Sequence, residues 1–138
     1  MEYNQYRRRS RKIKVGNIYI GGGAEIPVQS MTNVSSTDFP ALLAQMRQLR
    51  DIGCDIIRMT VPDRESARNI SRLKEAGITV PIVADIHFNY RLAIESAAAG
   101  ADKIRINPGN IGGEERVKAV VAACRNAGIP IRVGVNSG

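Results

Sequence analysis

Short hydrophobic runs alternate along this chain with longer segments whose apolar residues recur every three to four positions. The runs cover residues 27–33, 55–61, 80–86, 101–107 and 129–135. They are rich in Ile and Val, and we interpret them as strands that are buried on both faces, which is typical of a parallel sheet. The pattern therefore predicts five parallel strands.

The segments between these runs have the periodicity of amphipathic helices, with apolar side chains on one stripe. We expect four helices, over residues 39–50, 63–76, 89–99 and 113–126. Thr37 or Asp38 is a suitable N-cap for the first of them. A glycine follows each predicted helix, as is common where a helix ends in a left-handed residue. These glycines are Gly53, Gly77, Gly100 and Gly128.

Two apolar triplets on either side of Asn17 predict a small β-hairpin ahead of the first parallel strand. Strand–helix units that repeat about every 25 residues indicate either a TIM barrel or a doubly wound sheet. No dinucleotide fingerprint follows the first strand and every strand ends in polar residues, so we favour the barrel. A complete (β/α)8 barrel has about 250 residues. Five strands in 138 residues therefore predict a truncated chain that forms part of an α/β TIM barrel.

The charge of the chain is concentrated near its start. The 138 residues have 20 basic and 13 acidic side chains, a formal net charge of +7, and residues 1–14 hold six of the basic side chains and one acidic one. We divide the chain into a basic leader, 1–14, and a barrel portion, 15–138. We favour a solvated leader over a nucleic-acid or anionic-surface contact, since few aromatic residues accompany the charge.

The two cysteines have no spacing typical of a disulfide framework or a metal site. We expect Cys54 and Cys124 to be unreactive reduced thiols. No apolar run reaches the roughly 20 residues of a membrane span, and no apolar region follows the basic start as in a secretory signal. The expected location is the cytoplasm, without membrane contact.

Three arginines occupy equivalent places in three strands, each four or five residues after a helix-ending glycine. They are Arg58, Arg105 and Arg132. Side chains at the carboxyl ends of barrel strands meet at one mouth. A buried arginine is costly without an anionic partner, and its guanidinium group matches phosphate oxygens. The spacing predicts a cationic ring that binds a phosphorylated small molecule.

Nearby carboxylates leave a second interpretation open, in which these arginines are paired internally. Asp85 neutralises one arginine on that view, and Asp55 or Asp102 neutralises others. We favour the phosphate site because Asp85 alone cannot balance three arginines. Asp55 and Asp102 stand at strand starts, toward the opposite end of the barrel.

Two further features lie at the same predicted rim. His87 follows a strand, and we favour a ligand contact or proton donor there over a structural histidine. The segment 106–115, with Asn, Pro and three Gly before a helix, is suited to holding an anion on backbone N–H groups, although a simple tight turn has the same composition. Asp85 and His87 have no third ligand at a suitable spacing, so we predict no metal site in this chain.

Five segments carry a family resemblance: PVQSMTN, IIRMTVP, VADIHFNYRLA, KIRINPGNIG and IRVGVNSG. In this order they resemble the barrel half of the 4-hydroxy-3-methylbut-2-enyl diphosphate synthase family, over about residues 10–138. The resemblance implies an oxidoreductase of isoprenoid biosynthesis, the MEP pathway. Its substrate is 2-C-methyl-D-erythritol 2,4-cyclodiphosphate and its product 4-hydroxy-3-methylbut-2-enyl diphosphate. It also implies a [4Fe–4S] cluster, electrons from flavodoxin or ferredoxin, and a homodimer.

The same resemblance implies a substrate-binding set and a catalytic role for His87. The set is Arg58, His87, Arg105, Asn107, Arg132 and Asn136. The family's cluster ligands, three Cys and one Glu, belong to a C-terminal domain that does not match this chain. Cys54 and Cys124 do not fit that motif. We therefore expect the chain to supply a diphosphate-binding face, to bind no cluster and to be inactive alone.

Two alternatives stay open. One is another barrel enzyme that acts on a phosphorylated substrate without a cluster, such as a pterin-transferring synthase. The other is a non-enzymatic binding module, or an RNA contact built on residues 7–14. A pterin preference would favour the first, and salt-sensitive RNA binding that depends on the leader would favour the second.

Overall fold

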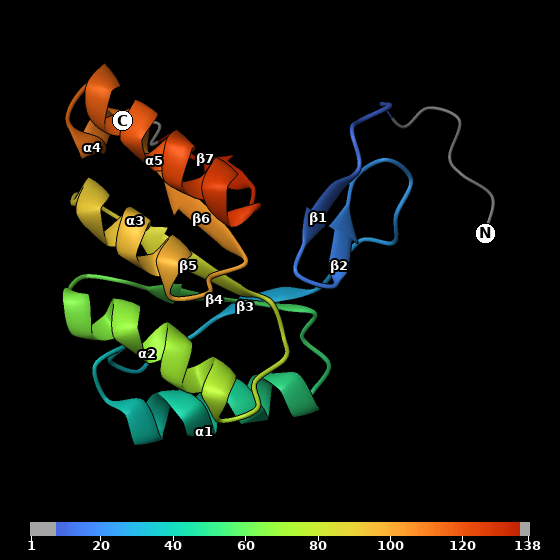
Figure 1. The fold of residues 1–138 in the computed structure, drawn as a ribbon. Coiled ribbons are helices and arrows are strands. Elements are labelled where there is room, and N and C mark those ends of the chain that lie inside the picture. Colours follow the sequence, from blue (N-terminus) through green and yellow to red (C-terminus); the bar gives the residue numbers. More distant parts are fainter. Residues whose placement is uncertain (1–7, 136–138) are drawn as a thin grey trace.

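The fold consists of a small hairpin and a five-stranded parallel sheet (Figure 1). It is seen in a computed structural model that describes residues 8–135. The hairpin pairs β1 (Ile13–Val15) with β2 (Ile18–Ile20) in antiparallel register. The sheet has the order β3-β4-β5-β6-β7. Its strands are β3 (Gln29–Met31), β4 (Ile56–Thr60), β5 (Ile82–Ile86), β6 (Lys103–Ile106) and β7 (Ile131–Val133). The predicted hairpin and five parallel strands are confirmed.

Four long helices lie on one side of the sheet, and the hairpin lies on the other (Figure 1). They are α1 (Phe39–Asp51), α2 (Arg64–Glu75), α3 (Tyr90–Ala98) and α5 (Glu114–Ala127). These helices connect successive parallel strands, as expected of part of a TIM barrel. Asp38, and not Thr37, caps the first helix, since its Oδ1 accepts from the Ala41 N–H at 3.3 Å.

The expectation of four helices needs a correction, because a fifth short helix, α4 (Pro108–Ile111), follows β6. The side chain of Asn107 starts this helix by accepting a hydrogen bond from the Gly109 N–H at 3.0 Å. Pro108 fits the first helical turn because its nitrogen needs no partner there. Gly112, with a φ of +101°, ends the helix. The turn expected in segment 106–115 is therefore partly helical.

The larger hydrophobic core lies between the sheet and the helices. Alternate strand residues, among them Ile57, Ile82 and Ile104, are fully buried against the helices. The helices contribute apolar residues such as Leu42 and Ile70 to the same cluster. Burial of this area is the main favourable term in the stability of such a fold.

A second, smaller core joins the hairpin to the opposite face of the sheet. Val15 of the hairpin is buried with Ile56 of β4 and Val83 of β5, and Ile18 and Ile20 pack against them. The hairpin turn also approaches the start of β5 closely, since a Cβ at Gly16 would lie 2.8 Å from Pro81 Cγ. The hairpin thus covers the N-terminal end of this face, which we call the inner face.

The interpretation of strands that are apolar on both faces is correct only where the hairpin covers them. Residues two apart in a strand share a face. Beyond Ile56 the next inner-face residue of β4 is Arg58, and beyond Val83 the next of β5 is Asp85. The inner face therefore changes from apolar to charged along the strands, because the hairpin reaches only their starts.

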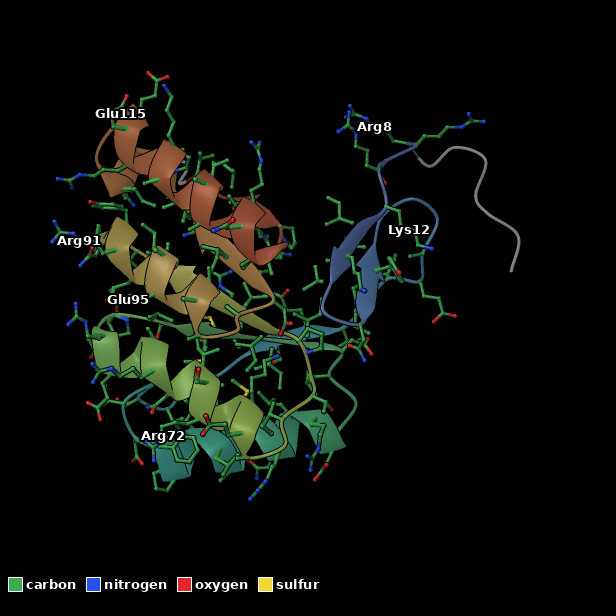
Figure 2. All side chains as sticks on the ribbon, viewed as in Figure 1. Arg8, Lys12, Arg72, Arg91, Glu95 and Glu115 are labelled. Carbon is green, nitrogen blue, oxygen red and sulfur yellow. The ribbon has the colours of Figure 1, made fainter. Side chains whose placement is uncertain are left out.

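The described part of the basic leader lies on the hairpin side of the molecule, away from the long helices. Figure 2 shows Arg8 and Lys12 there, whereas Arg72 and Glu95 lie on the helices. The Lys12 Nζ stands 4.4 Å from the centre of the Tyr19 ring. The strand β1 begins at Ile13, so the last two residues of the predicted leader belong to the hairpin. Among residues 8–135, no helix is both long and apolar enough to span a bilayer.

Candidate functional site

The register of the parallel strands brings charged side chains together on the inner face. Asp85 of β5 pairs with Arg105 of β6, and Arg105 pairs with Arg132 of β7. One step nearer the strand starts, Arg58 of β4 and Lys103 of β6 flank Val83 of β5. Residues in register on adjacent strands point to the same face. We refer to Arg58, Asp85, His87, Lys103, Arg105 and Arg132 as the Asp85 cluster.

Asp85 is the centre of this cluster, and it is only 1% exposed. Its Oδ2 accepts from Arg58 Nε at 3.0 Å and from Arg58 Nη2 at 2.5 Å. Its Oδ1 accepts from Arg105 Nη1 at 3.5 Å. His87 Nε2 also lies 3.5 Å from Oδ2. One buried carboxylate therefore accepts hydrogen bonds from two guanidinium groups and has the His87 imidazole beside it.

The internal pairing that the sequence left open is realised only in part. Asp85 contacts two of the three arginines, while Arg132 has no ion-pair partner within the described residues. Asp55 and Asp102 lie at strand starts as predicted: Asp55 accepts from the Val28 N–H, and Asp102 accepts from the Ile82 N–H, both at 2.8 Å. The cluster thus has more cations than one carboxylate can balance.

Lys103 is a cation of this cluster that the sequence analysis missed. It is 8% exposed. Its pKa is lowered by burial and, to a smaller extent, by the charges of Arg132 and Arg58. Its position two residues before Arg105 on one strand places both on the inner face, and that spacing was the available signal. Burial is thus the main cause of the lowered Lys103 pKa, and the neighbouring arginines add to it.

His87 lies at the rim of the cluster, directly after β5. Its side chain is 52% exposed, and its ring lies 6.1 Å from the ring of the exposed Phe88. The imidazole therefore touches a buried carboxylate on one side and reaches solvent on the other. Such a histidine is placed to contact a bound ligand or to donate a proton to it.

Of the two asparagines in the predicted set, only Asn107 lies within the described residues. Asn107 is 7% exposed at the end of β6, and its Oδ1 is used to cap α4. Its amide nitrogen is the group left for a ligand. Asn136 lies outside the described residues. The structure thus brings Arg58, Arg105 and His87 together around Asp85, with Arg132 beside Arg105 in register.

The cysteines do not fit an iron–sulfur cluster. Cys124 lies on the buried face of α5, and burial raises the pKa of its thiol to about 11. Cys54 is half-buried near the start of β4. Cluster ligands are thiolates that surround one site, and these two residues do not provide one. Within residues 8–135, no three His, Cys, Asp or Glu side chains are grouped to hold a metal ion.

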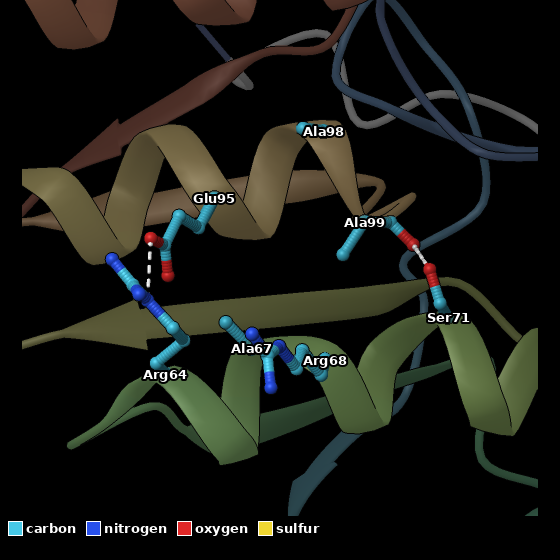
Figure 3. Close-up of a pocket in the computed structure, with 7 residues that line it drawn as sticks. All are labelled: Arg64, Ala67, Arg68, Ser71, Glu95, Ala98 and Ala99. Carbon is cyan, nitrogen blue, oxygen red and sulfur yellow. Dashed lines mark hydrogen bonds and ion pairs between the residues drawn. The ribbon is translucent and has the colours of Figure 1, made fainter.

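A groove on the outer surface lies between α2 and α3 (Figure 3). Its volume is about 340 Å³, and it is lined by Arg64, Ala67, Arg68, Ser71, Glu95, Ala98 and Ala99. Arg64 Nε and Glu95 Oε1 form an ion pair of 3.0 Å, and the Ser71 hydroxyl donates to the Ala99 carbonyl. None of these residues belongs to the Asp85 cluster, so this groove is not the predicted site.

Sequence comparisons give a family match over almost the whole chain. A family model described as the GcpE TIM-barrel domain matches residues 10–138. The chain is 57% identical over 129 residues to 4-hydroxy-3-methylbut-2-en-1-yl diphosphate synthase (flavodoxin) of Caldicellulosiruptor saccharolyticus. It is 56% identical over 132 residues to the protein of that name from Pseudomonas paraeruginosa. These alignments cover 94% and 96% of the chain, which spans only 37% and 35% of the relatives.

Solved structures show the same fold at much lower identity. The 7,8-dihydropteroate synthase of Vibrio fischeri matches with a TM-score of 0.66 and 18% identity, over 94% of this chain and 50% of that one. The dihydropteroate synthase of Thermus thermophilus, in complex with 6HMPPP, matches with a TM-score of 0.62 and 19% identity, over 88% and 45%. At such identities the likeness concerns the fold alone.

Proposed function

The chain belongs to the GcpE TIM-barrel family, and on that premise we propose that it supplies the diphosphate-binding face of a 4-hydroxy-3-methylbut-2-en-1-yl diphosphate synthase. The whole protein is then an oxidoreductase of isoprenoid biosynthesis in the cytoplasm. It reduces 2-C-methyl-D-erythritol 2,4-cyclodiphosphate to 4-hydroxy-3-methylbut-2-enyl diphosphate. Identities of 56–57% to relatives with that activity in their name support the proposal.

The observation that carries the proposal is the excess of positive charge in the Asp85 cluster. Three arginines and one lysine share the inner face with one buried carboxylate. A diphosphate group supplies several negative charges and acceptor oxygens that match guanidinium donors. Its binding would offset the charges of Arg132 and Arg58, which add to the effect of burial on the Lys103 pKa. The cluster is therefore a site whose charge balance is completed by an anion.

The residues of the cluster have distinct roles in this proposal. Asp85 holds Arg58 and Arg105 so that their remaining N–H groups face the ligand. Arg132, which has no carboxylate partner within residues 8–135, binds the diphosphate directly. Asn107 offers its amide nitrogen, and the family motif adds Asn136.

His87 is the proposed proton donor of the set. It reaches both Asp85 and solvent at the rim. A ring nitrogen that carries a proton can donate it to an oxygen of the bound substrate.

Electrons and the reducing centre come from outside this chain. Flavodoxin is the donor named for the relatives, and ferredoxin is the alternative. The [4Fe–4S] cluster of the family requires ligands that residues 8–135 do not provide. We propose that the isolated chain binds substrate without reducing it, and that the full-length protein is a homodimer.

A comparison of three ligands tests the proposal. The cyclic diphosphate of methylerythritol, a pterin pyrophosphate and an RNA are titrated separately into the 138-residue chain, and binding is measured by calorimetry. We expect saturable 1:1 binding of the cyclic diphosphate and a clear preference for it. A preference for the pterin would favour a synthase of the dihydropteroate type. Binding of RNA alone, lost when the leader is removed, would favour the non-enzymatic alternative.

A further inference from the structure

Gly134 occupies a position in which any larger residue would collide with the Asp85 cluster. It directly follows β7, and its φ lies outside the left-handed region, so backbone strain does not require a glycine there. A Cβ at this position would lie 2.5 Å from Arg105 Nη2, 2.8 Å from Arg105 Nε and 2.9 Å from Arg105 Cζ. All three atoms belong to the guanidinium group, which therefore lies directly against the Gly134 backbone.

Neither the Gly134 backbone nor the Arg105 guanidinium group can move away from this contact easily. The Gly134 N–H donates to the Ile106 carbonyl at 2.9 Å, which holds this segment against β6. The Arg105 side chain is only 15% exposed, and Asp85 lies 3.5 Å from its Nη1. The guanidinium group is thus confined between a buried carboxylate and a glycine backbone.

This confinement opposes the effect of charge repulsion between two neighbouring arginines of the cluster. Arg132 is the register neighbour of Arg105, and like charges on adjacent strands repel each other. Such repulsion favours conformations in which a long charged side chain turns toward solvent. The missing side chain at Gly134 opens the space in which Arg105 can stay beside Asp85 instead.

We propose that Gly134 is a positioning residue, which holds the Arg105 guanidinium in the orientation that the diphosphate site uses. The inference rests on the proposed function for its effect on ligand binding. The contact itself does not depend on that function. A Cβ at residue 134 would turn the guanidinium away from Asp85 and misalign its N–H groups. Affinity for a diphosphate would fall although no binding residue had been removed.

The first test compares Gly134→Ala with wild type and with Gly53→Ala in the 138-residue chain. Gly53 is a matched control: it adopts a φ of +102°, so alanine there strains the backbone, but a Cβ would meet nothing within 4 Å. The Arg105 Nε–H resonance is followed by NMR without ligand, and inorganic pyrophosphate is the binding probe. We expect Gly134→Ala to shift that resonance and to weaken pyrophosphate binding roughly tenfold, as for a misaligned charge-assisted hydrogen bond. Gly53→Ala should leave both unchanged.

A double-mutant cycle with Arg105→Ala makes the test specific. If Gly134 acts through Arg105, then Gly134→Ala should weaken pyrophosphate binding no further once the guanidinium is gone. The same cycle applies to thermal unfolding. Should Gly134→Ala fold poorly, Arg105→Ala should restore its stability, because the clash is then removed.

The outcomes separate this inference from the proposed function. If wild type binds pyrophosphate but Gly134→Ala binds it equally well, or if the two substitutions have additive effects, the positioning role is wrong and the function stands. If wild type does not bind pyrophosphate, the proposed function fails. In that case the Arg105 resonance alone decides: a shift in Gly134→Ala supports the positioning role, and an unchanged resonance overturns it.

Discussion

The two faces of the parallel sheet consist of alternate residues of the same strands, yet they have opposite chemistry. In β6, Ile104 and Ile106 point into the core beneath the helices, while Lys103 and Arg105 point to the inner face. The helix side of β4, β5 and β6 is apolar along its whole length. The inner face is apolar only where the hairpin covers it, around Ile56 and Val83.

This contrast shows how a charged site is supported. Burial on the helix side stabilises the sheet, so the inner face can hold several like charges that oppose folding. Asp85 limits that cost by pairing with two arginines. Substitutions on the helix side should therefore change stability, whereas substitutions of the cations should mainly change ligand binding.

Removal of the Asp85 charge should have the largest effect on the free energy of unfolding. It tests whether the inner face, like the helix side, contributes to the stability of the sheet. Asp85→Asn leaves the guanidinium groups of Arg58 and Arg105 without a carboxylate partner. We expect a loss of about 3–5 kcal/mol in the free energy of unfolding, the range for breaking a buried ion pair. Urea unfolding measures it. A loss below about 1 kcal/mol would mean that solvent already screens this cluster.

A substitution on the helix side should affect stability alone. Ile104→Ala removes a fully buried side chain that packs under the helices. The expected loss is about 2–4 kcal/mol of unfolding free energy, because a cavity remains. In conditions where the variant stays folded, its affinity for pyrophosphate should equal that of wild type. A parallel loss of affinity would show that the two faces are not independent.

Arg132→Ala should leave stability almost unchanged and weaken ligand binding, which is the reverse of the result expected for Ile104→Ala. Arg132 is exposed and has no ion-pair partner within residues 8–135, so unfolding in urea should change by less than about 0.5 kcal/mol. Pyrophosphate binding should weaken by about 1.5–3 kcal/mol, the range for a hydrogen bond to a charged group. Unchanged calorimetric affinity would remove Arg132 from the site.

Lys103→Met should have the smallest effect, and it should raise the free energy of unfolding where the other substitutions lower it or leave it unchanged. The Lys103 pKa is lowered in the folded protein, so the unfolded chain binds more protons between that pKa and the ordinary value of 10.5. The charged lysine therefore opposes folding fully below its folded-state pKa, and this cost disappears as the pH rises toward 10.5. We expect methionine to stabilise the protein by about 1 kcal/mol near neutral pH, and by less in alkaline buffer. Equal gains at both pH values, measured by urea unfolding, would contradict this cause.

Much of the helix side could be predicted from the sequence, because its signals are local. Apolar periodicity gave the strands and long helices, and the positions of Asp38 and Gly53 marked helix ends. The helix α4 escaped prediction because a single turn has no periodicity. It depends on one hydrogen bond, from the Gly109 N–H to Asn107.

The inner face was harder to predict, because its properties come from residues far apart in the chain. Glycine-based spacing located the three arginines. It did not reveal that Asp85 holds two of them, which depends on strand register. Neither did it show that a hairpin more than 35 residues earlier covers Ile56. Lys103 was within reach, since strand alternation alone places it beside Arg105.

Proton uptake on ligand binding tests most directly whether the inner face lacks an anion. Pyrophosphate is titrated calorimetrically into the 138-residue chain at a pH between the lowered Lys103 pKa and 10.5, in buffers of different ionisation enthalpy. We predict saturable binding accompanied by proton uptake, because an anion beside Lys103 raises its pKa, and we predict that Lys103→Met abolishes the uptake. Absence of saturable binding would contradict the diphosphate site, and binding without any proton uptake would contradict the place of Lys103 in it.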